Sequence, residues 1–399
     1  MTAPSRRVLA INSGSSSLKA AAYELGPAEA RVLSVEASRI GLPGSRLRVV
    51  GGDERVVDGP QDLPDHETAL QALFRQLDRE HPALRPDVVG HRVVHGGGRH
   101  WAPELVVPEL MVSLEQLARI DPEHLPQAIA AIRAVEQAYP GVPQVACFDT
   151  GFHQGLPAVA RRYALPRDLA EAGVVRYGFH GLSYEYVLQE LRQIDEPAAG
   201  GRVVIAHLGN GASMAALQEG RSIDTTMGFS PTGGLVMGTR CGDLDPSVII
   251  YLLRERGMTV DAISRLINRQ AGLLGVSGTS GDMRDLLARE ASDSRAADAV
   301  TLFCYQAKKY LGASAAAIGG LDLLVFTAGI GERAAPVRER ICAGLDFLGI
   351  ELDGERNRRH GPVISSERSQ VTVRVIRTNE ELMVARYASR VVPGAGPPA

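Results

Sequence analysis

The sequence predicts an α/β fold organised as two domains. Apolar runs of strand length alternate with stretches of helical periodicity along the chain, which is the order expected of sheets flanked by helices. The chain has 399 residues, of which 45% are hydrophobic and 22% are charged, so it is too long for one compact domain but can bury two cores. One layout, an apolar strand, a Gly/Ser/Asn turn and a second apolar strand, occurs at 8–22 and again at 203–217, which suggests an internal duplication.

Short apolar runs predict the strands of mixed sheets. Most of these runs are bounded by Gly, Pro or Asp, as is typical of buried strands. They occupy residues 8–12, 31–37, 88–94, 144–148, 203–208, 323–327 and 371–376.

Helical spacing and helix-boundary residues predict the flanking helices. Between 245 and 257, Asp245 suits the N-cap, Pro246 the first helical position and Gly257 the stop. A longer helix is expected over about 295–318. Apolar residues also recur with helical periodicity at Ala69, Leu70, Leu73, Phe74 and Leu77, and at Ile129, Ile132 and Val135.

Charge and cysteine usage restrict the partners and the compartment. The formal net charge of -3 arises from 43 basic and 46 acidic residues without long blocks of one sign, so nothing favours nucleic acid or anionic lipid as a partner. The four cysteines form no C-x-x-C pair, which favours reduced thiols over a disulfide framework or a zinc site. No apolar run reaches the length of a membrane span. We therefore expect a cytoplasmic protein with a small-molecule partner.

Two turns have the composition of phosphate-binding loops. Residues 12–19 combine Gly14, which permits close approach of the backbone, with serine donors and the positive charge of Lys19. Residues 207–211 form a second turn rich in Gly and Asn after an apolar strand. Neither turn matches the P-loop or the dinucleotide-binding fingerprint. For the first turn, a polar hairpin with an exposed lysine is the alternative.

Charged residues and a histidine stand at strand ends or in glycine-rich loops. Arg92 lies where a strand gives way to such a loop, and Asp149 follows another strand, where α/β folds usually place active groups. His180 lies between glycines, and Arg240 lies in a glycine-rich loop before a capped helix, a setting suited to anions. Residues 326–332 join a strand to a helix through two glycines, as nucleotide contact requires. Taken singly, these features also fit a surface arginine, a capping aspartate or a structural histidine.

Taken together, the motifs resemble the acetate kinase family, the acetate/propionate kinase group of the actin-like ATPase superfamily. The matching segments span nearly the whole chain and read INSGSSSLK, GHRVVHGG, FDTGFH, RYGFHG, AHLGNGAS, MGTRCGDLDP, GTSGDMRD, FTAGIGE and TNEELMVAR. The resemblance implies two actin-like (ribonuclease H-like) domains around a central cleft, with mixed sheets flanked by helices. It assigns 1–150 plus about 380–399 to an acid-binding domain and 151–379 to a nucleotide-binding domain. It also implies a homodimer that uses ATP and ADP with Mg²⁺ or Mn²⁺.

The resemblance further implies a reaction, the reversible in-line transfer of the γ-phosphoryl group of ATP to acetate, which gives acetyl phosphate and ADP. A carboxylate is already a charged nucleophile at neutral pH, so the difficulty is its repulsion by the phosphates, and positive charge must offset that repulsion. By resemblance, Arg92 and Arg240 hold the acid and the transferring group, and His180 donates a hydrogen bond. Asp149 is assigned to ordering the water shell of the metal and Arg240 rather than to proton transfer.

The remaining roles also follow from the resemblance alone. The acid would be bound by Arg92, Val94, Phe179 and Pro231. The metal would be bound by Asn12 and Glu380. The nucleotide would be bound by Lys19, His207, Leu208, Gly209, Asn210, Gly211, Asp282, Met283, Arg284, Gly329, Ile330, Gly331, Glu332 and Arg333.

Several positions depart from the family pattern. Glu123 stands where the family has an apolar residue before His-Asn-Pro, and it puts the identity of the acid in question. Tyr184 replaces a second histidine, Cys241 replaces a serine, and residues 230–234 differ from the more usual Pro-Leu-Glu-Gly. The alternatives are therefore a kinase for propionate or another short acid, a phosphoanhydride hydrolase in which Asp149 activates water, and an actin-like ATP switch.

Overall fold

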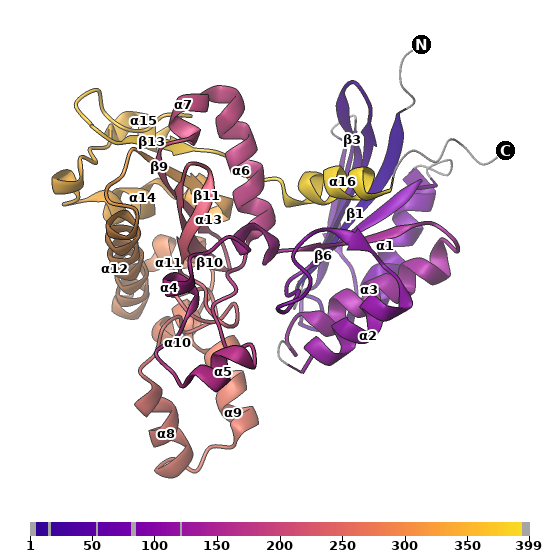
Figure 1. The fold of residues 1–399 in the computed structure, drawn as a ribbon, viewed down its shortest axis with the longest axis horizontal. Helices are drawn as coiled ribbons and strands as arrows, with labels where there is room; N and C mark the ends of the chain where they lie inside the picture. The colour runs from indigo at the N-terminus through magenta and orange to yellow at the C-terminus, as the bar shows by residue number, and fades with distance from the viewer. Residues whose placement is uncertain (1–4, 15–16, 53–54, 81–84, 120–121, 393–399) are drawn as a thin grey trace. The chain divides into compact units, whose positions relative to one another are not determined.

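The computed structural model describes residues 5–14, 17–52, 55–80, 85–119 and 122–392 (Figure 1). The chain divides into two compact units: unit 1 is Met1–Gly151 with Asn379–Ala399, and unit 2 is Phe152–Thr378. Each unit contains one mixed sheet flanked by helices, which confirms the predicted α/β fold.

The sheet of unit 1 has the strand order β5-β4-β3-β2-β1-β6-β8-β7. The pairs β1/β6 and β6/β8 are parallel, and the other neighbours are antiparallel. The strands are β1 (Arg6–Ser13), β2 (Ser17–Leu25), β3 (Glu29–Ser38), β4 (Arg46–Gly51), β5 (Val56–Pro60), β6 (Val88–Val93), β7 (Glu104–Leu105) and β8 (Gln144–Phe148).

Helices cover both faces of this sheet (Figure 1). On one face, α1 (His66–Glu80) and α3 (Leu125–Ala138) pack on a buried apolar layer that includes Leu9, Ile11 and Leu33, with α2 (Pro108–Leu117) beside α3. On the other face lies α16 (Glu380–Val391), from the C-terminal end of the chain. A Cβ built on Gly90 would lie 2.6 Å from Val384 Cγ1, so this close approach of helix to strand requires glycine.

The sheet of unit 2 repeats the central arrangement of unit 1. Its order is β11-β10-β9-β12-β13, with an antiparallel hairpin followed by two parallel neighbours, as in β3-β2-β1-β6-β8. The hairpins β1–β2 and β9–β10 therefore occupy equivalent positions, as the predicted duplication requires. The strands are β9 (Arg202–Leu208), β10 (Ala212–Gln218), β11 (Arg221–Thr225), β12 (Leu323–Thr327) and β13 (Thr372–Val375).

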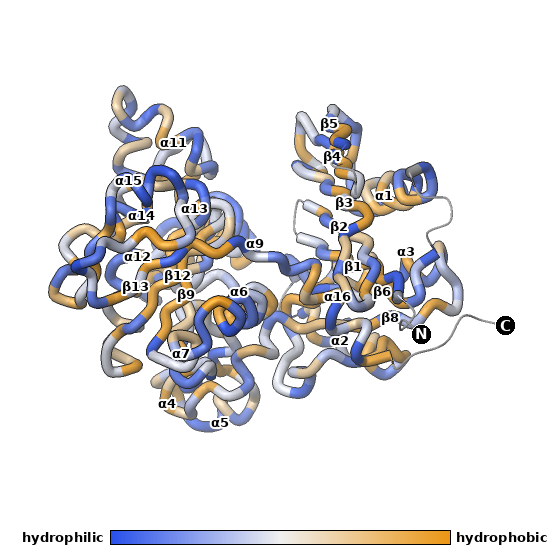
Figure 2. The backbone as a smooth tube through the Cα atoms, turned by 90° about the horizontal axis from the view of Figure 1, so that it is seen from above, coloured by the Kyte–Doolittle hydropathy of each residue, from blue (hydrophilic) through white to orange (hydrophobic). Residues whose placement is uncertain are grey.

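Helices also flank this second sheet. The helix α6 (Gly181–Ile194) with α7 (Glu196–Ala199) packs on one face, and α12 (Ser294–Ala317) contacts β9, β10 and β11. Hydrophobic residues dominate β9 and β12 (Figure 2). The other helices are α4 (Ala158–Arg161), α5 (Arg167–Glu171), α8 (Pro246–Arg254), α9 (Val260–Arg265), α10 (Gly272–Ser277), α11 (Met283–Arg289), α13 (Ala328–Arg333), α14 (Ala335–Cys342) and α15 (Gly354–Arg358), with short 3-10 or π segments at Gly151–His153, Leu266–Gln270 and Asp346–Leu348.

Each predicted strand and helix is present, and two details differ. The helix α8 begins after Asp245, whose side chain accepts a hydrogen bond from Ser247 N, but it ends at Arg254 rather than at Gly257. None of its residues is buried, and its side chains Val248, Ile250, Tyr251 and Leu253 are exposed. The glycines of 326–332 do not precede a helix but lie inside α13, which begins at Ala328.

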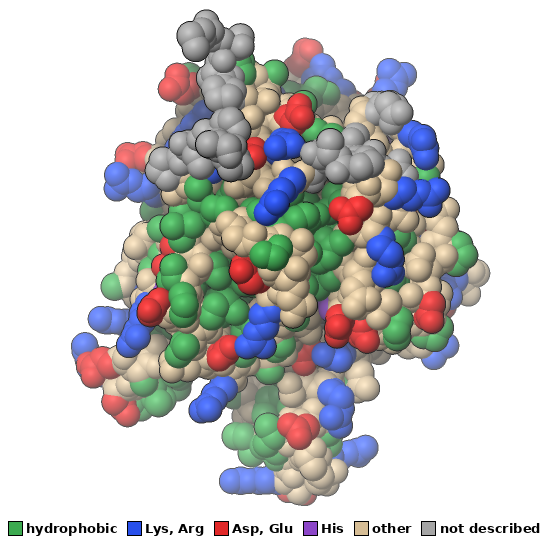
Figure 3. All heavy atoms as spheres, turned by 90° about the vertical axis from the view of Figure 1, so that its right-hand side faces the viewer, with side chains coloured by type: hydrophobic (Ala, Val, Ile, Leu, Met, Phe, Trp, Pro, Cys, Tyr) green, Lys and Arg blue, Asp and Glu red, His purple; other side chains and the backbone are tan. Residues whose placement is uncertain are grey.

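On the face that Figure 3 shows, acidic and basic side chains are intermingled rather than separated by sign. Among the residues that the structure describes, no helix is both long and apolar enough to cross a lipid bilayer.

Candidate active site

In unit 1, the parallel pairing of β6 with β8 brings Arg92 next to Asp149. The register pairs Arg92 with Cys147 and Val93 with Phe148, so both strands end at the same edge of the sheet. Asp149 directly follows β8, and its backbone N donates to the carbonyl of Val93. Arg92 Nε then donates to Asp149 Oδ2 at 3.0 Å, and the carboxylate is fully buried. Two residues far apart in sequence thus form one ion pair.

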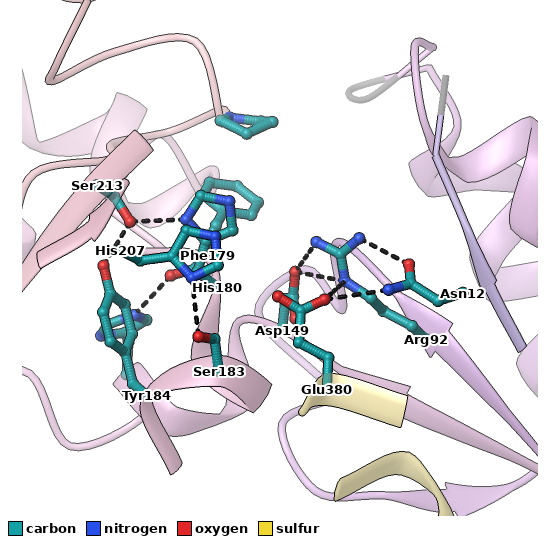
Figure 4. Close-up of polar contacts among 12 residues, drawn as sticks. Asn12, Arg92, Asp149, Phe179, His180, Ser183, Tyr184, His207, Ser213 and Glu380 are labelled. Atoms are coloured by element: carbon teal, nitrogen blue, oxygen red, sulfur yellow. Dashed lines mark hydrogen bonds and ion pairs between the residues drawn. The ribbon is translucent and has the colours of Figure 1, made fainter. Parts of the chain in front are cut away.

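The start of α16 extends this ion pair into a network (Figure 4). Arg92 Nη1 donates to Asn12 Oδ1 at 2.9 Å, and Asn12 Nδ2 donates to Glu380 Oε2 at 3.0 Å and to Glu381 Oε1 at 3.3 Å. Asn379 caps the helix by accepting from Leu382 N. The sequence motifs at the start, middle and end of unit 1 therefore meet at one place.

Arg92 stays positively charged in this buried setting. Burial by itself would lower the pKa of its guanidinium, but the carboxylates of Asp149 and Glu380 more than offset that effect and raise the pKa above its usual value. The Oγ atom of Ser13, beside Asn12, is buried and has no hydrogen-bond partner in the structure. A charged guanidinium suits an anionic ligand, and the unsatisfied Ser13 hydroxyl is a further polar group at the end of β1.

Lys19 lies on β2 opposite Asn12 and lines a cavity of about 250 Å³. Burial lowers the pKa of Lys19, but Glu381 and Glu36 outweigh it and raise the pKa, so this lysine is also charged. Ser15 and Ser16 of the predicted phosphate turn lie outside the described residues.

In unit 2, a constrained backbone presents His180 at the start of α6. His180 has φ 61°, a left-handed conformation that costs free energy in a residue other than glycine. Gly178, with φ 77°, allows the chain to approach His153, since a Cβ there would lie 2.5 Å from His153 Cδ2. Strain of this kind often marks functional sites.

The hairpin β9–β10 and the first turn of α6 are joined by two serine–histidine pairs (Figure 4). The register sets Ser213 opposite His207. His180 Nδ1 lies 2.7 Å from Ser213 Oγ, and His207 Nδ1 lies 2.8 Å from Ser183 Oγ. The hydroxyl of Tyr184 also bonds to Ser213 Oγ. Both imidazoles are therefore held through Nδ1, with Nε2 on the opposite edge of the ring.

Arg240 and His180 approach the same point, which is Gly211. A Cβ built on Gly211 would lie 2.9 Å from Arg240 Nη2 and 3.1 Å from His180 Nε2. Arg240 Nη1 donates to the carbonyl of Pro231 at 2.7 Å, which fixes the guanidinium. Glycine at position 211 thus leaves room for the Arg240 guanidinium and the His180 Nε2 atom to face one space.

The predicted nucleotide segments of unit 2 lie beside one another at the ends of β9 and β12. Gly238 N donates to the carbonyl of Asn210 at 3.0 Å, and a Cβ on Gly238 would lie 3.1 Å from the carbonyl oxygen of Gly281. On the other side, a Cβ on Gly209 would lie 3.6 Å from Ala328 Cβ. Gly281 and Ala328 directly precede the predicted segments 282–284 and 329–333, so these segments are neighbours of 207–211.

Individual side chains within these segments differ in exposure. Asp282 caps α11 and pairs with Arg284, whose side chain is 86% exposed, whereas Met283 is buried. Glu332 Oε1 accepts from Thr378 N at 3.1 Å. Gly329, Ile330, Gly331 and Arg333 lie on α13 with Glu332, and Leu208 is the last residue of β9.

The three predicted acyl-pocket residues are apolar and mostly enclosed, but they belong to different units. Val94 follows β6 in unit 1 and is 4% exposed. Phe179, 1% exposed, and Pro231 belong to unit 2. The carbonyl of Phe179 accepts from His153 Nε2 at 3.1 Å. Their joint role stays a prediction.

Sequence reasoning overlooked Ser183, Ser213 and Glu381. Ser213 lies in the AHLGNGAS segment, and the turn at 209–211 was a signal that it pairs across the hairpin with His207. Glu381 follows the predicted metal residue Glu380 directly. Within the described ranges, no three or more His, Cys, Asp or Glu side chains are grouped as a metal site. Asn12 and Glu380 nevertheless supply oxygen donors of the kind that Mg²⁺ uses together with phosphate and water.

Comparison with known proteins gives consistent matches over nearly the full length. The acetokinase family model matches residues 7–386. An acetate kinase of Rhodopseudomonas palustris is 48% identical over 332 residues, which are 82% of this chain and 83% of that protein. Two crystal structures are also similar: an acetate kinase of Porphyromonas gingivalis, with TM-score 0.85 and 38% identity over 97% of this chain and 99% of the other, and a propionate kinase of Francisella tularensis, with TM-score 0.89 and 34% identity over 97% and 100%.

Proposed function

Because the chain belongs to the acetokinase family, we propose that it transfers the γ-phosphoryl group of ATP reversibly to the carboxylate of acetate, giving acetyl phosphate and ADP. The observation that supports this most strongly is the approach of Arg240 Nη2 and His180 Nε2 to Gly211. The Arg240 cation and a neutral His180 donor, facing one space, would stabilise the negative charge on a phosphoryl group during its transfer.

The proposed mechanism is a direct in-line displacement. A carboxylate oxygen of the acid attacks the γ-phosphorus, the new O–P bond forms as the bond to the β-phosphate oxygen breaks, and ADP leaves with that electron pair. No proton has to be removed from the nucleophile, because an acid with a reference pKa near 4 is ionised at neutral pH. The catalytic demand on the protein is therefore charge and orientation.

Each charged residue has a distinct role in this proposal. Arg92 binds the acid and offsets its repulsion by the γ-phosphate, and Arg240 binds the transferring phosphoryl oxygens. His180 donates a hydrogen bond to that group. Asp149 holds Arg92 through the buried ion pair and orders the surroundings of the metal rather than moving a proton. The two arginines thus supply the positive charge, and the proposed mechanism needs no general base.

ATP or ADP is proposed to bind along Lys19, 207–211, 282–284 and 329–333. Mg²⁺ or Mn²⁺ is proposed to bind near Asn12 and Glu380, and it would neutralise charge on the phosphates. Asn12 Oδ1 now accepts from Arg92, and the Glu380 carboxylate accepts from Asn12. Both oxygens would therefore exchange partners when the metal binds.

The identity of the acid is the narrower part of the proposal. Val94, Phe179 and Pro231 are apolar and suit a short alkyl group. Propionate is the alternative substrate, because the chain is also similar to the propionate kinase of Francisella tularensis. One methylene changes binding in an apolar pocket by only about 1 to 3 kcal/mol, so both acids are expected to react.

A homodimer in the cytoplasm is proposed as the working form. The helix α8 exposes Val248, Ile250, Tyr251 and Leu253, an apolar surface that a second copy would cover. The four cysteines are free thiols, which suits a reducing compartment. Light scattering of the wild type against a Tyr251→Glu variant tests the dimer, since the added charge is expected to yield monomer.

One assay tests the reaction. The protein is incubated with MgATP and acetate, propionate or butyrate, and acyl phosphate is trapped with hydroxylamine while ADP is measured. Equal amounts of hydroxamate and ADP, greatest with acetate, are expected. ADP formed without acid would instead indicate a hydrolase, and no turnover would indicate an ATP switch. With a γ-phosphoryl group made chiral by oxygen isotopes, one in-line step inverts phosphorus, whereas a phosphoenzyme route retains it.

A further inference from the structure

Three histidines of unit 2 share one mode of attachment. His153, His180 and His207 each place Nδ1 within 2.7–2.8 Å of a serine Oγ, from Ser222, Ser213 and Ser183 respectively. Because a neutral imidazole has one N–H, the direction of the hydrogen bond at Nδ1 decides whether Nε2 donates or accepts.

His153 shows the direction that this attachment takes. Its Nε2 lies 3.1 Å from the carbonyl oxygen of Phe179, which can only accept, so Nε2 carries the proton. Burial lowers the pKa of His153 to about 4, so the ring is neutral at physiological pH. Its Nδ1 therefore accepts from the Ser222 hydroxyl.

At His180, the Tyr184 hydroxyl orients the Ser213 hydroxyl so that the hydrogen bond to Nδ1 has the same direction as at His153. Ser213 Oγ contacts both His180 Nδ1 and the hydroxyl of Tyr184. A phenol is more acidic than an aliphatic alcohol, so Tyr184 is the better donor and Ser213 the better acceptor. With Tyr184 donating to Ser213, the Ser213 proton points to His180 Nδ1, and successive hydrogen bonds strengthen each other.

The neighbours of His180 favour its neutral form. Arg240 Nη2 shares the space at Gly211 with His180 Nε2, and the His207 ring stacks on the His180 ring with centroids 4.1 Å apart. A positive charge on His180 would be repelled by the guanidinium and would bar a charge on His207. A neutral ring then has its single proton either on Nδ1 or on Nε2.

We propose that Tyr184, acting through Ser213, is a positioning residue that holds His180 as the neutral tautomer with its proton on Nε2. This rests on the proposed function, since Nε2–H is then the donor to the transferring phosphoryl group. Tyr184 is suited to the role because it is fully buried, donates its backbone N–H to the carbonyl of His180 at 3.1 Å, and packs against Phe152 and His153. Tyrosine at a position where the resemblance implies histidine thus has a defined task.

The test combines nitrogen NMR with kinetics on the full chain. Protein labelled with ¹⁵N-histidine gives the protonation of each ring nitrogen, and the His180 signals are assigned by their loss in His180→Gln. In the wild type, a protonated Nε2 and an unprotonated Nδ1 are expected. In Tyr184→Phe, part of the proton population moves to Nδ1, and kcat falls about tenfold with little change in either KM, as is usual when a supporting partner of a site residue is removed. Ser213→Ala is expected to have the larger effect on kcat.

Matched controls separate the relay from general loss of buried hydrogen bonds. Tyr177→Phe removes a buried tyrosine hydroxyl that bonds to the carbonyl of Gly173 at 2.8 Å, and Ser222→Ala removes the serine of the His153 pair. Both are expected to keep the wild-type kcat and the His180 signals. Thermal unfolding of all variants verifies that they fold.

Three results would overturn the proposal. They are a charged or Nδ1-protonated His180 in the wild type, unchanged His180 signals in Tyr184→Phe whatever its kcat, and an unchanged kcat in Tyr184→Phe. The nitrogen signals do not depend on turnover. A wild type with the expected tautomer but no acyl phosphate would therefore reject the proposed function and leave the tautomer assignment standing.

Discussion

The imidazole rings of His180 and His207 are stacked, with centroids 4.1 Å apart and planes 19° from parallel. His180 precedes α6 but bonds to Ser213 of β10, whereas His207 belongs to β9 but bonds to Ser183 of α6. The helix and the hairpin are therefore tied to each other twice. A displacement of either element would move both rings together.

Replacing Gly211 by alanine is expected to disturb this arrangement. The added Cβ would lie 2.9 Å from Arg240 Nη2 and 3.1 Å from His180 Nε2, so at least one group must shift. A displacement of about 1 Å can cost about a hundredfold in rate, so kcat should fall by about that factor. Steady-state kinetics with acyl phosphate trapping measure it.

Gly312 provides the control for that substitution. Nothing lies within 4 Å of a Cβ at this position in α12, so Gly312→Ala should keep kcat and gain a few tenths to about 1 kcal/mol in stability. Equal kinetics for the two variants would contradict the role assigned to Gly211.

Arg92 is expected to require its guanidinium as well as its charge. Arg92→Lys keeps a cation but replaces the planar fork, which donates to Asp149 from Nε and to Asn12 from Nη1, by a single nitrogen, so kcat should fall by about 10² to 10³. The KM for the acid should rise too, because Arg92 is proposed to bind it.

Arg374 is a matched position outside the site. Its side chain is 14% exposed, as is that of Arg92, and it pairs with Asp195 at 3.4 Å. Arg374→Lys should retain full activity. If both lysine variants lost activity equally, the effect of Arg92→Lys would be structural.

Arg338 is expected to support the nucleotide segment from behind. This fully buried arginine donates to the carbonyls of Gly331 and Asn357 at 2.8 Å each. Arg338→Met would remove the donors to these carbonyls and to Asn357 Oδ1, so unfolding should become easier by about 3 kcal/mol, and the KM for ATP should rise. Urea unfolding and ATP titration measure the two effects.

Arg359, an exposed arginine at the end of α15, provides the comparison with Arg338. Arg359 pairs with Glu355 at 2.6 Å and its side chain is 78% exposed, so Arg359→Ala should change stability by less than about 0.5 kcal/mol. If Arg338→Met and Arg359→Ala lost a similar amount of stability, the burial of Arg338 would not explain its effect.

Acid is expected to weaken unit 1 through His91. Burial lowers the pKa of His91 to about 4 from 6.5, although Gln144 bonds to its Nε2, and the buried Nδ1 has no partner in the structure. Between pH 6.5 and 4 the unfolded chain binds the extra proton and the folded chain does not. The stability contribution is therefore complete above pH 6.5 and declines by up to about 3 kcal/mol as the pH falls to 4.

Fluorescence of the single tryptophan, Trp101, follows unfolding of unit 1 in urea at each pH. His91→Gln should flatten the pH dependence because glutamine has no titrating group and keeps a donor for Gln144. Replacing the partly exposed His66 by glutamine should leave the slope unchanged. A slope unaltered by His91→Gln would rule out this histidine as the cause.

Local patterns were sufficient to predict most elements of the fold. Strand runs such as 144–148 and 323–327 coincide with β8 and β12, because a buried strand needs consecutive apolar residues and a turn at each end. The strands β4, β5, β7 and β11 were not predicted. Much of β5 is exposed, and β7 has two residues, so neither carries a strong apolar pattern.

What the sequence by itself determined is the set of elements, the family likeness and the residue types at the strand ends, since these depend on short-range order along the chain. The tertiary structure alone decided that Arg92 bonds to Asp149 and that His180 bonds to Ser213. The first pair depends on the register of β6 against β8, and the second depends on the packing of the start of α6 beside the hairpin β9–β10. Partners across a sheet are selected by packing of whole elements, and that information is not contained in any single segment.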